Sequence, residues 1–290
     1  MIEQIVIMTL VTGGVYALLA IGFSLIFGNA RVINLAHTGF FMLAAYGLYY
    51  FMRIAGLHTI WAILITVPAV TALGILAYRF LINPIREHLA AVLLMTVALA
   101  MAFQEAMTGV FSSLYWSIPA LIPGFTSILG VSVLNQHLLT LGIVAVVIAI
   151  VALILSRTKL GIALRAVAQD AEVATLMGIS VPRTLMITMG IATCLAAVAA
   201  VAVVPIWIIH PAMWSPPLVM VMVIVVLGGL GSVKGAIIGA FIISFVEVLV
   251  SNTMPTYAYL KVVFAILAMV IVLIVRPAGL FGTIFEEEKL

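Results

Sequence analysis

Long, uninterrupted runs of apolar residues recur along the whole chain. Each run is about twenty residues long, which is the length an α-helix needs to cross the hydrocarbon core of a membrane. The runs are continuous and do not alternate every second residue, so they exclude a transmembrane β-barrel. They predict nine segments, at residues 4–28, 34–52, 59–81, 90–111, 137–156, 184–208, 217–232, 235–252 and 257–276. Because segment 217–232 is short, eight full crossings and a partial one also fit.

Composition supports the same class of protein. The chain has 290 residues, of which 66% are hydrophobic and only 7% are charged, whereas soluble domains carry about 25% charged residues. We therefore expect an all-α polytopic membrane protein forming a single transmembrane domain over residues 1–290. The net charge of +3 is assigned to loop residues that set topology, and no nucleic-acid partner is expected. The start, MIEQIVIM, has no basic region and is interpreted as the first span, not a cleaved signal.

The stretch 156–183 interrupts the apolar pattern between the fifth and sixth segments. It carries four of the twelve Lys and Arg residues of the chain, namely Arg157, Lys159, Arg165 and Arg183. Within it, Asp170 is a candidate N-cap, the sequence AEVATLM follows, and Gly178 is a candidate helix stop. The pattern predicts a small folded helix that a membrane protein presents to something in the cytoplasm.

The distribution of basic residues predicts the orientation. Arg79 and Arg86 lie in the loop after the third segment, two crossings away from the basic stretch 156–183, so both loops share one side. The connection 112–136 between them has no charged residue. By the positive-inside rule the basic loops and the C-terminus are cytoplasmic, while the N-terminus and 112–136 are outside. Arg53 falls on the outer side against this rule, and the acidic tail Glu286–Glu288 is expected to be a solvated end.

Small residues are concentrated near both ends of the chain. Gly13 and Gly14 lie in the first segment, and a second group follows the sequence VLGGLGSVKGAIIGAFIIS. There Gly231, Gly235 and Gly239 repeat every four residues beside a parallel ridge of Ala236, Ala240 and Ser244, which predicts close helix packing. Short or broken helices at corresponding positions also suggest an inverted repeat of the kind found in transporters.

Motifs for catalysis are missing from the sequence. It contains no H-E-x-x-H, C-x-x-C or G-x-S-x-G pattern, and no Gly-Lys dipeptide that a phosphate-binding loop requires. The five histidines are too scattered to hold a metal. We expect a protein that is not an enzyme and that binds no cofactor and no metal.

Polar residues inside the spans are the candidates for a substrate pathway, because burying them in lipid is costly. They are Asn34, His37, Gln104, Glu105 and Glu247. They would line a substrate route or hold two broken helices in register. Two other interpretations stay open: the glutamates lie near the external ends and are exposed to water, or Asn34 and His37 cap a helix. Neither glutamate has an obvious cationic partner in a span, which argues against a proton relay.

Two resemblances give these patterns a function. Glu172, Ala174 and Gly178 have the spacing E-x-A-x-x-x-G, which resembles the E-A-A-x-x-x-G signature of ABC-importer permeases, although Val173 replaces the second alanine. The segments GGVYALLAIGFSLIFGNARVINLAHTGFFMLAAY, LGIALRAVAQDAEVATLMGISVPR, VVLGGLGSVKGAIIGAFIISFVE and VRPAGLFG occur in the order and spacing of the branched-chain amino acid permease family. This second resemblance covers residues 10–282, and the chain is most similar to the shorter permease of the pair. Urea permeases are similar at these motifs.

The resemblance implies a multi-pass subunit of an ABC importer in the bacterial plasma (inner) membrane, working by ATP-driven alternating access. The implied partners are a second homologous permease, two ATP-binding subunits that hydrolyse ATP, and an extracytoplasmic substrate-binding protein. Residues Arg165, Asp170, Glu172, Ala174 and Gly178 would couple the chain to the ATPases. The binding protein would contact residues 112–136 and 209–217, which include Trp214.

The substrate stays open at this stage. Branched-chain or related hydrophobic amino acids are favoured, while urea, short amides or small carboxylates fit the sequence nearly as well. A secondary transporter that works alone and a membrane scaffold without transport are the alternatives from other classes.

Overall fold

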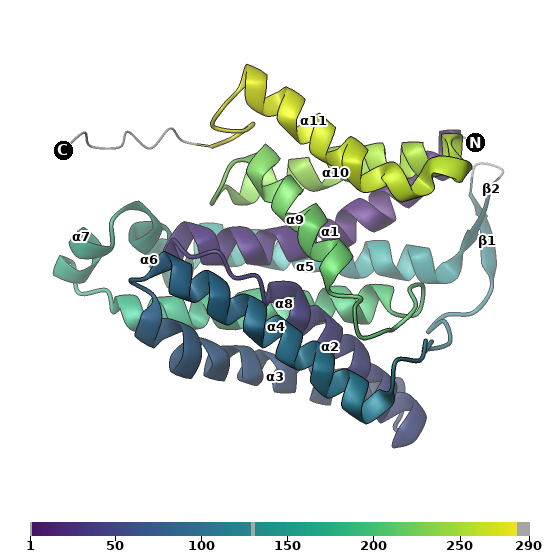
Figure 1. Ribbon diagram of the computed structural model, residues 1–290, viewed down its shortest axis with the longest axis horizontal. Helices are drawn as coiled ribbons and strands as arrows, with labels where there is room; N and C mark the ends of the chain where they lie inside the picture. Colours follow the sequence, from purple (N-terminus) through teal and green to yellow (C-terminus); the bar gives the residue numbers. More distant parts are fainter. Residues whose placement is uncertain (1, 129–130, 283–290) are drawn as a thin grey trace.

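The computed structural model describes residues 2–128 and 131–282 and shows a bundle of helices that run side by side along its long axis (Figure 1). The helices are α1 (Ile2–Ala30), α2 (His37–Tyr49), α3 (Thr59–Ala77), α4 (Leu89–Phe111), α5 (Asn135–Arg157), α6 (Lys159–Gln169), α7 (Ala171–Leu176), α8 (Val181–Val203), α9 (Ser215–Gly228), α10 (Val233–Thr253) and α11 (Lys261–Val275). Short π or 3-10 turns extend α2 and α3 and precede α11, at Tyr50–Ile54, Tyr78–Ile82, Asn83–Ile85 and Pro255–Leu260.

The helices confirm the predicted all-α membrane fold. Within the described residues, seven helices are long and apolar enough to cross a membrane, and α9 is a shorter apolar helix. Each predicted segment contains one helix, so the count of eight or nine holds approximately. Helix α8 ends at Val203, five residues before its predicted boundary at 208, because Pro205 cannot donate to a continuing helix.

Helices α1, α2 and α8 form the interior of the bundle, and nearly every residue of the short helix α2 is buried. In the most apolar windows of α1 and α8, 72% of the residues are buried, compared with 17% for α4 and α5 and 6% for the span that contains α11. Helix α1 makes its most extensive contacts with α10 and then with α8. Since the peripheral helices carry apolar residues on their exposed faces, these faces suit contact with lipid.

Glycines allow the backbones of α1, α9 and α10 to approach closely. A side chain at Gly13 of α1 would collide with Phe241 of α10, and a side chain at Gly235 of α10 would collide with the backbone carbonyl of Gly228 at the end of α9. The two regions of small residues near the chain ends therefore pack against each other. The predicted ridge of Gly231, Gly235 and Gly239 does not lie entirely on α10. Gly231 lies in the turn before this helix, with φ +82°, and packs on Gly28.

A small hairpin lies at the end of the bundle opposite α7 (Figure 1). Strands β1 (Phe125–Ile128) and β2 (Val131–Leu134) pair antiparallel, with Phe125 opposite Leu134. Sequence reasoning treated this region only as a loop, because such short strands give a weak signal.

Candidate coupling site and transport path

Helix α7 has a well-defined start and stop. The Asp170 carboxylate accepts hydrogen bonds from the backbone N–H groups of Glu172 and Val173, at 2.8 and 2.9 Å. At the other end Gly178 has φ +83°, a conformation that costs a side-chain-bearing residue free energy. Its N–H donates to the carbonyl of Thr175 at 3.0 Å. The predicted N-cap and glycine stop are therefore confirmed.

The exposed surface of α7 carries large apolar side chains beside the polar Glu172 and Thr175. Helix α7 packs against α6 and α8 and projects beyond the bundle (Figure 1). Leu176 is 85% exposed, Met177 just after the helix is 78% exposed, and Val173 is 53% exposed. Ala174 points the other way and is only 3% exposed. Of the predicted coupling residues, Glu172 and Gly178 thus lie on the exposed surface, whereas Ala174 holds α7 against the bundle. The three exposed apolar residues escaped sequence reasoning because nearly every other residue is apolar too.

Helix α6 connects α7 to the spans. Its buried residues, Gly161, Leu164 and Val167, lie on one face, and α6 contacts α5, α1 and α8. Arg165 donates from its guanidinium to the carbonyl of Leu155 near the end of α5. Arg165 therefore fastens α6 to a span and lies on a different element from the capped helix α7.

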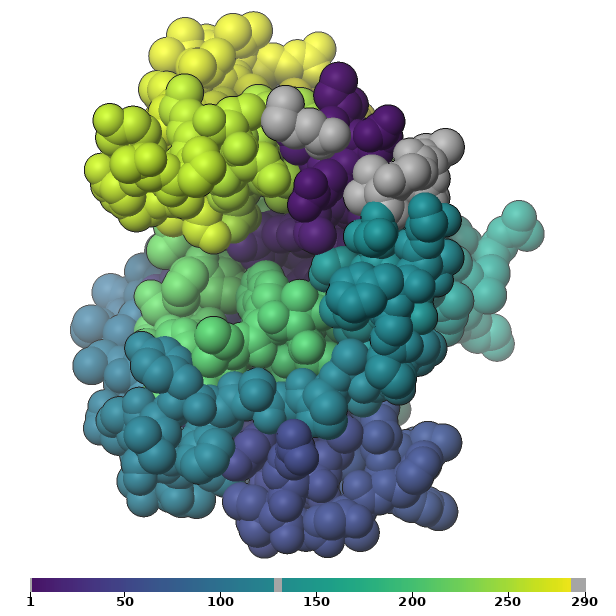
Figure 2. Space-filling view, turned by 90° about the vertical axis from the view of Figure 1, so that its right-hand side faces the viewer, coloured from purple at the N-terminus to yellow at the C-terminus, as the bar shows by residue number. Residues whose placement is uncertain are grey.

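At the opposite end, the two segments that were expected to face outward meet. Trp116 and Ile209 exchange backbone hydrogen bonds of 2.9 and 2.8 Å, and the rings of Tyr115 and His210 lie 5.6 Å apart. The indole N–H of Trp214 donates to Gln104 Oε1 at 2.8 Å. Figure 2 looks onto this end, where the teal residues of the 112–136 connection lie next to the green residues that follow α8. They form one continuous surface, which we name the outer platform after the side on which the distribution of basic residues predicts it.

Asn34 and His37 are fully buried structural residues at the start of α2. Asn34 Oδ1 accepts the N–H of Ala36 at 3.1 Å, and its Nδ2 lies 3.6 Å from the sulfur of Met189 in α8. His37 Nε2 lies 3.0 Å from the carbonyl oxygen of Leu19 in α1. These contacts join α1, α2 and α8. They do not cap α2, because its N-cap residue is Ala36 and no side chain makes a capping hydrogen bond there.

Glu247 is buried and paired with a cation. Its side chain lies in α10 and is 6% exposed, and its Oε1 accepts from Lys261 Nζ, the first residue of α11, at 2.6 Å. The expectation that neither glutamate has a cationic partner in a span is therefore wrong for Glu247, because the next helix along the chain, α11, supplies the cation. The interpretation that Glu247 lies at an external end and is exposed to water is also wrong.

Glu105 is exposed on α4, next to the residue that binds Trp214. The five candidate pathway residues consequently fall in three separate places: the α1–α2–α8 junction, the outer platform with Glu105, and the α10–α11 pair. Among the described residues, no group of three His, Cys, Asp or Glu side chains could hold a metal ion.

A bundle of apolar helices that carries a capped helix at one end and an uncharged platform at the other has the build of a multi-pass permease. The family model described as "Branched-chain amino acid transport system / permease component" matches residues 5–273. The chain therefore belongs to this family and is a permease component of a transport system, as the sequence motifs predicted.

Relatives of known name agree over almost the whole chain. The high-affinity branched-chain amino acid transport system permease protein BraD of Pseudomonas aeruginosa is 27% identical over 94% of this chain and 93% of its own length. The corresponding protein LivH of Escherichia coli K12 is 28% identical over 93% and 92%. The probable branched-chain amino acid permease LivH of Methanocaldococcus jannaschii is 25% identical over 94% and 90%.

One solved structure shares the fold. PsaBC from Streptococcus pneumoniae in complex with Fab matches with a TM-score of 0.53 and 16% identity, covering 96% of this chain and 97% of that chain. At this identity the likeness concerns the fold alone.

Proposed function

We propose that this chain is the membrane-spanning subunit of an ABC importer for branched-chain or related hydrophobic amino acids, driven by ATP hydrolysis on separate subunits. The observation that carries the proposal is α7. Leu176 and Met177 are exposed apolar side chains on a rigidly capped helix that extends past the spans. Outside the membrane, such a patch marks a protein contact.

The partner of α7 is inferred to be an ATPase subunit in the cytoplasm. The loops that carry Arg79, Arg86 and the stretch 156–183 are basic, and the positive-inside rule assigns them to that side. A short helix that is fixed at both ends moves as a unit when its partner moves. Helix α6 joins α7 to α5, α1 and α8. A displacement of α7 by its partner would therefore be transmitted through α6 to the interior helices.

The outer platform is proposed to receive a substrate-binding protein. The connection 112–136 has no charged residue, and Tyr115, Trp116 and Trp214 provide large amphipathic side chains of the kind enriched at interfaces. A second, homologous permease completes the pathway, and the two permeases alternate between inward- and outward-facing arrangements.

The substrate class, branched-chain or related hydrophobic amino acids, is inferred from the named relatives.

The pairing of Glu247 argues against a secondary transporter. Within the described residues, this buried glutamate already has Lys261 as its partner. It therefore does not offer the unpaired carboxylate that an ion-coupled secondary transporter would use. Selectivity would then reside mainly in the binding protein, which leaves urea, short amides and small carboxylates as the alternative substrates.

Uptake by reconstituted components tests this function. The chain, its partner permease and two ATPases are placed in proteoliposomes with leucine-loaded binding protein outside and ATP inside. We expect leucine to accumulate only when ATP and the binding protein are both present, and isoleucine and valine to compete. Uphill uptake by the chain alone, without nucleotide, would overturn the proposal, and uptake of urea in place of leucine would change its substrate.

A further inference from the structure

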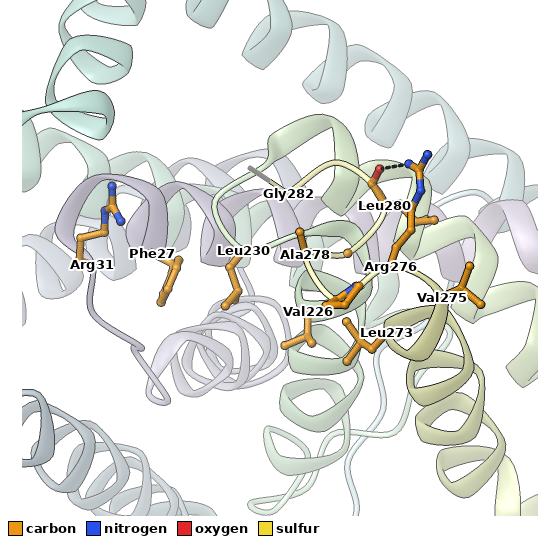
Figure 3. Close-up of a pocket in the computed structure, with 12 residues that line it drawn as sticks. Phe27, Arg31, Val226, Leu230, Leu273, Val275, Arg276, Ala278, Leu280 and Gly282 are labelled. Atoms are coloured by element: carbon orange, nitrogen blue, oxygen red, sulfur yellow. Dashed lines mark hydrogen bonds between the residues drawn. The ribbon is translucent and has the colours of Figure 1, made fainter. Parts of the chain in front are cut away.

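A cleft with an apolar floor and a basic rim lies at the same end of the bundle as α7. It has two lobes of about 750 and 550 Å³ that share Phe27, Arg31 and Leu230. The larger lobe is enclosed by the ends of α1, α9 and α11 and by residues 276–282 (Figure 3).

The wall formed by residues 276–282 is fixed in place. The N–H groups of Leu280 and Phe281 donate to the carbonyls of Leu227 and Gly228 at the end of α9, at 2.9 and 3.0 Å. Gly279, with φ +79°, lies directly on the backbone of Gly229. The VRPAGLFG sequence therefore builds a permanent wall, and the cleft is a preformed feature of the bundle.

The lining separates apolar and charged groups. Phe27, Val226, Leu230 and Leu273 lie along the apolar part, while the guanidinium groups of Arg31 and Arg276 stand on the same side of it in Figure 3. Arg276 donates one hydrogen bond to the carbonyl of Leu280 at 3.2 Å, and Arg31 donates one to the carbonyl of Ala168 at 3.3 Å. A guanidinium has five donors. Arg165 lines the smaller lobe. None of the described residues that line either lobe is acidic.

The backbone at Arg31 adds a second observation. Arg31 terminates α1 with φ +54°, and its N–H donates to the carbonyl of Phe27 at 2.9 Å. This left-handed end is usually glycine, because a side chain is strained in that conformation. The chain thus places a cation at the mouth of the cleft in a position where glycine would fold more easily.

We propose that this cleft binds the headgroup of an anionic phospholipid from the cytoplasmic leaflet. The headgroup would lie along the basic rim, whose arginines Arg31 and Arg276 stand at opposite ends of the cleft in Figure 3, and the glycerol with the start of the acyl chains would cover the apolar floor. Basic pockets between membrane helices at the cytoplasmic surface favour such headgroups. Helices α1 and α11, which both belong to segments long and apolar enough to span a membrane, end beside the cleft, and the segment with α11 is the most exposed of the described spans. The assignment of this end to the cytoplasm rests on the proposed function.

Native mass spectrometry of the purified, delipidated chain in mild detergent tests the proposal. Phosphatidylglycerol and phosphatidylcholine with identical acyl chains are offered at equal concentration. We expect phosphatidylglycerol to be retained preferentially. Each of Arg31→Gly and Arg276→Gln should weaken its retention about fivefold, since one cation near an anionic surface contributes about 1 kcal/mol. Arg31→Gly relieves the backbone strain but also removes the hydrogen bond from Arg31 to the carbonyl of Ala168. Arg276→Gln leaves α1 unchanged and is therefore the second variant that keeps the test decisive.

The matched control is Arg157→Gln, which removes an exposed cation at the same end of the bundle but outside the cleft. It should retain phosphatidylglycerol unchanged. Equal retention of both lipids, or an equal loss in the control, would overturn the proposal. A variant that ends at Gly282 lacks the acidic residues Glu286–Glu288. If only this variant retains phosphatidylglycerol, the acidic residues occupy the cleft in the full chain, and the proposal is overturned. The assay uses no nucleotide and no uptake, so its failure is separate from a failure of the transport function.

Discussion

The N-cap of α7 gives the most informative perturbation of the coupling site. The two hydrogen bonds of Asp170 to Glu172 and Val173 satisfy donors at the start of a helix of only six residues. Replacing an N-cap carboxylate by alanine costs about 1 kcal/mol, and such a short helix has little stability of its own. Asp170→Ala should therefore lower the ratio of formed to unformed α7 about fivefold.

Asparagine caps a helix about as well as aspartate. Asp170→Asn therefore keeps the cap while removing the charge, which makes it a matched control. We expect Asp170→Ala to reduce ATP-dependent leucine uptake by the reconstituted importer severalfold, while Asp170→Asn stays near the original rate. The melting temperature of the membrane domain should change little in both, because α7 lies outside the spans.

The comparison between the two variants decides whether the formed helix matters. If the alanine variant transports normally, a rigid α7 is not needed for coupling. If both variants fail equally, the charge of Asp170 is the important property, and the capping argument is wrong.

Four further perturbations test other parts of the account. Glu247→Gln leaves Lys261 without its partner and should lower thermal stability measurably, whereas Glu105→Gln on the exposed face of α4 should not. Gly235→Val collides with the backbone of Gly228 and should destabilise the chain by more than about 1 kcal/mol, while Gly142→Ala has open space and should be tolerated. Trp214→Phe loses the 2.8 Å bond to Gln104 and should weaken docking of the binding protein in a surface-binding assay, with the exposed Trp61→Phe as control. Burial lowers the pKa of His210, so the folded chain binds fewer protons than the unfolded chain. Stability of the outer platform should therefore fall as the pH drops below about 6.5, and His210→Gln should remove that part of the dependence in a pH-dependent melting series.

The membrane helices could be predicted because length and continuity of apolar runs are imposed by the bilayer itself. The ends of α7 could also be predicted, since Asp170 and Gly178 act through their own neighbouring backbone groups. These features are local, and local chemistry is visible in a sequence.

Partners between distant helices could not be predicted in the same way. Trp214 meets Gln104 across 110 positions. Even on the consecutive helices α10 and α11, the pairing of Glu247 with Lys261 depends on the turn between them, which the apolar pattern does not specify. The hydrophobic pattern does not specify which faces of α4, α9, α10 and α11 meet, because almost every face is apolar. The candidate pathway residues were consequently grouped by polarity alone, and the structure distributes them over three places.

The exposed apolar residues of α7 could not be recognised from the sequence either. Leu176 and Met177 look ordinary in a chain that is 66% hydrophobic. They become meaningful only when the structure shows them on a helix that projects beyond the spans.

A site-specific photocrosslink at α7 tests the central claim most directly. The single cysteine is removed as Cys194→Ala, a cysteine is introduced as Leu176→Cys, and a benzophenone label is attached to it in the purified complete importer. The account predicts that irradiation links residue 176 to an ATPase subunit and that a label at Leu57→Cys, in the loop between α2 and α3, does not. A link from residue 176 to the binding protein, or equal labelling of the ATPase from residue 57, would contradict the account.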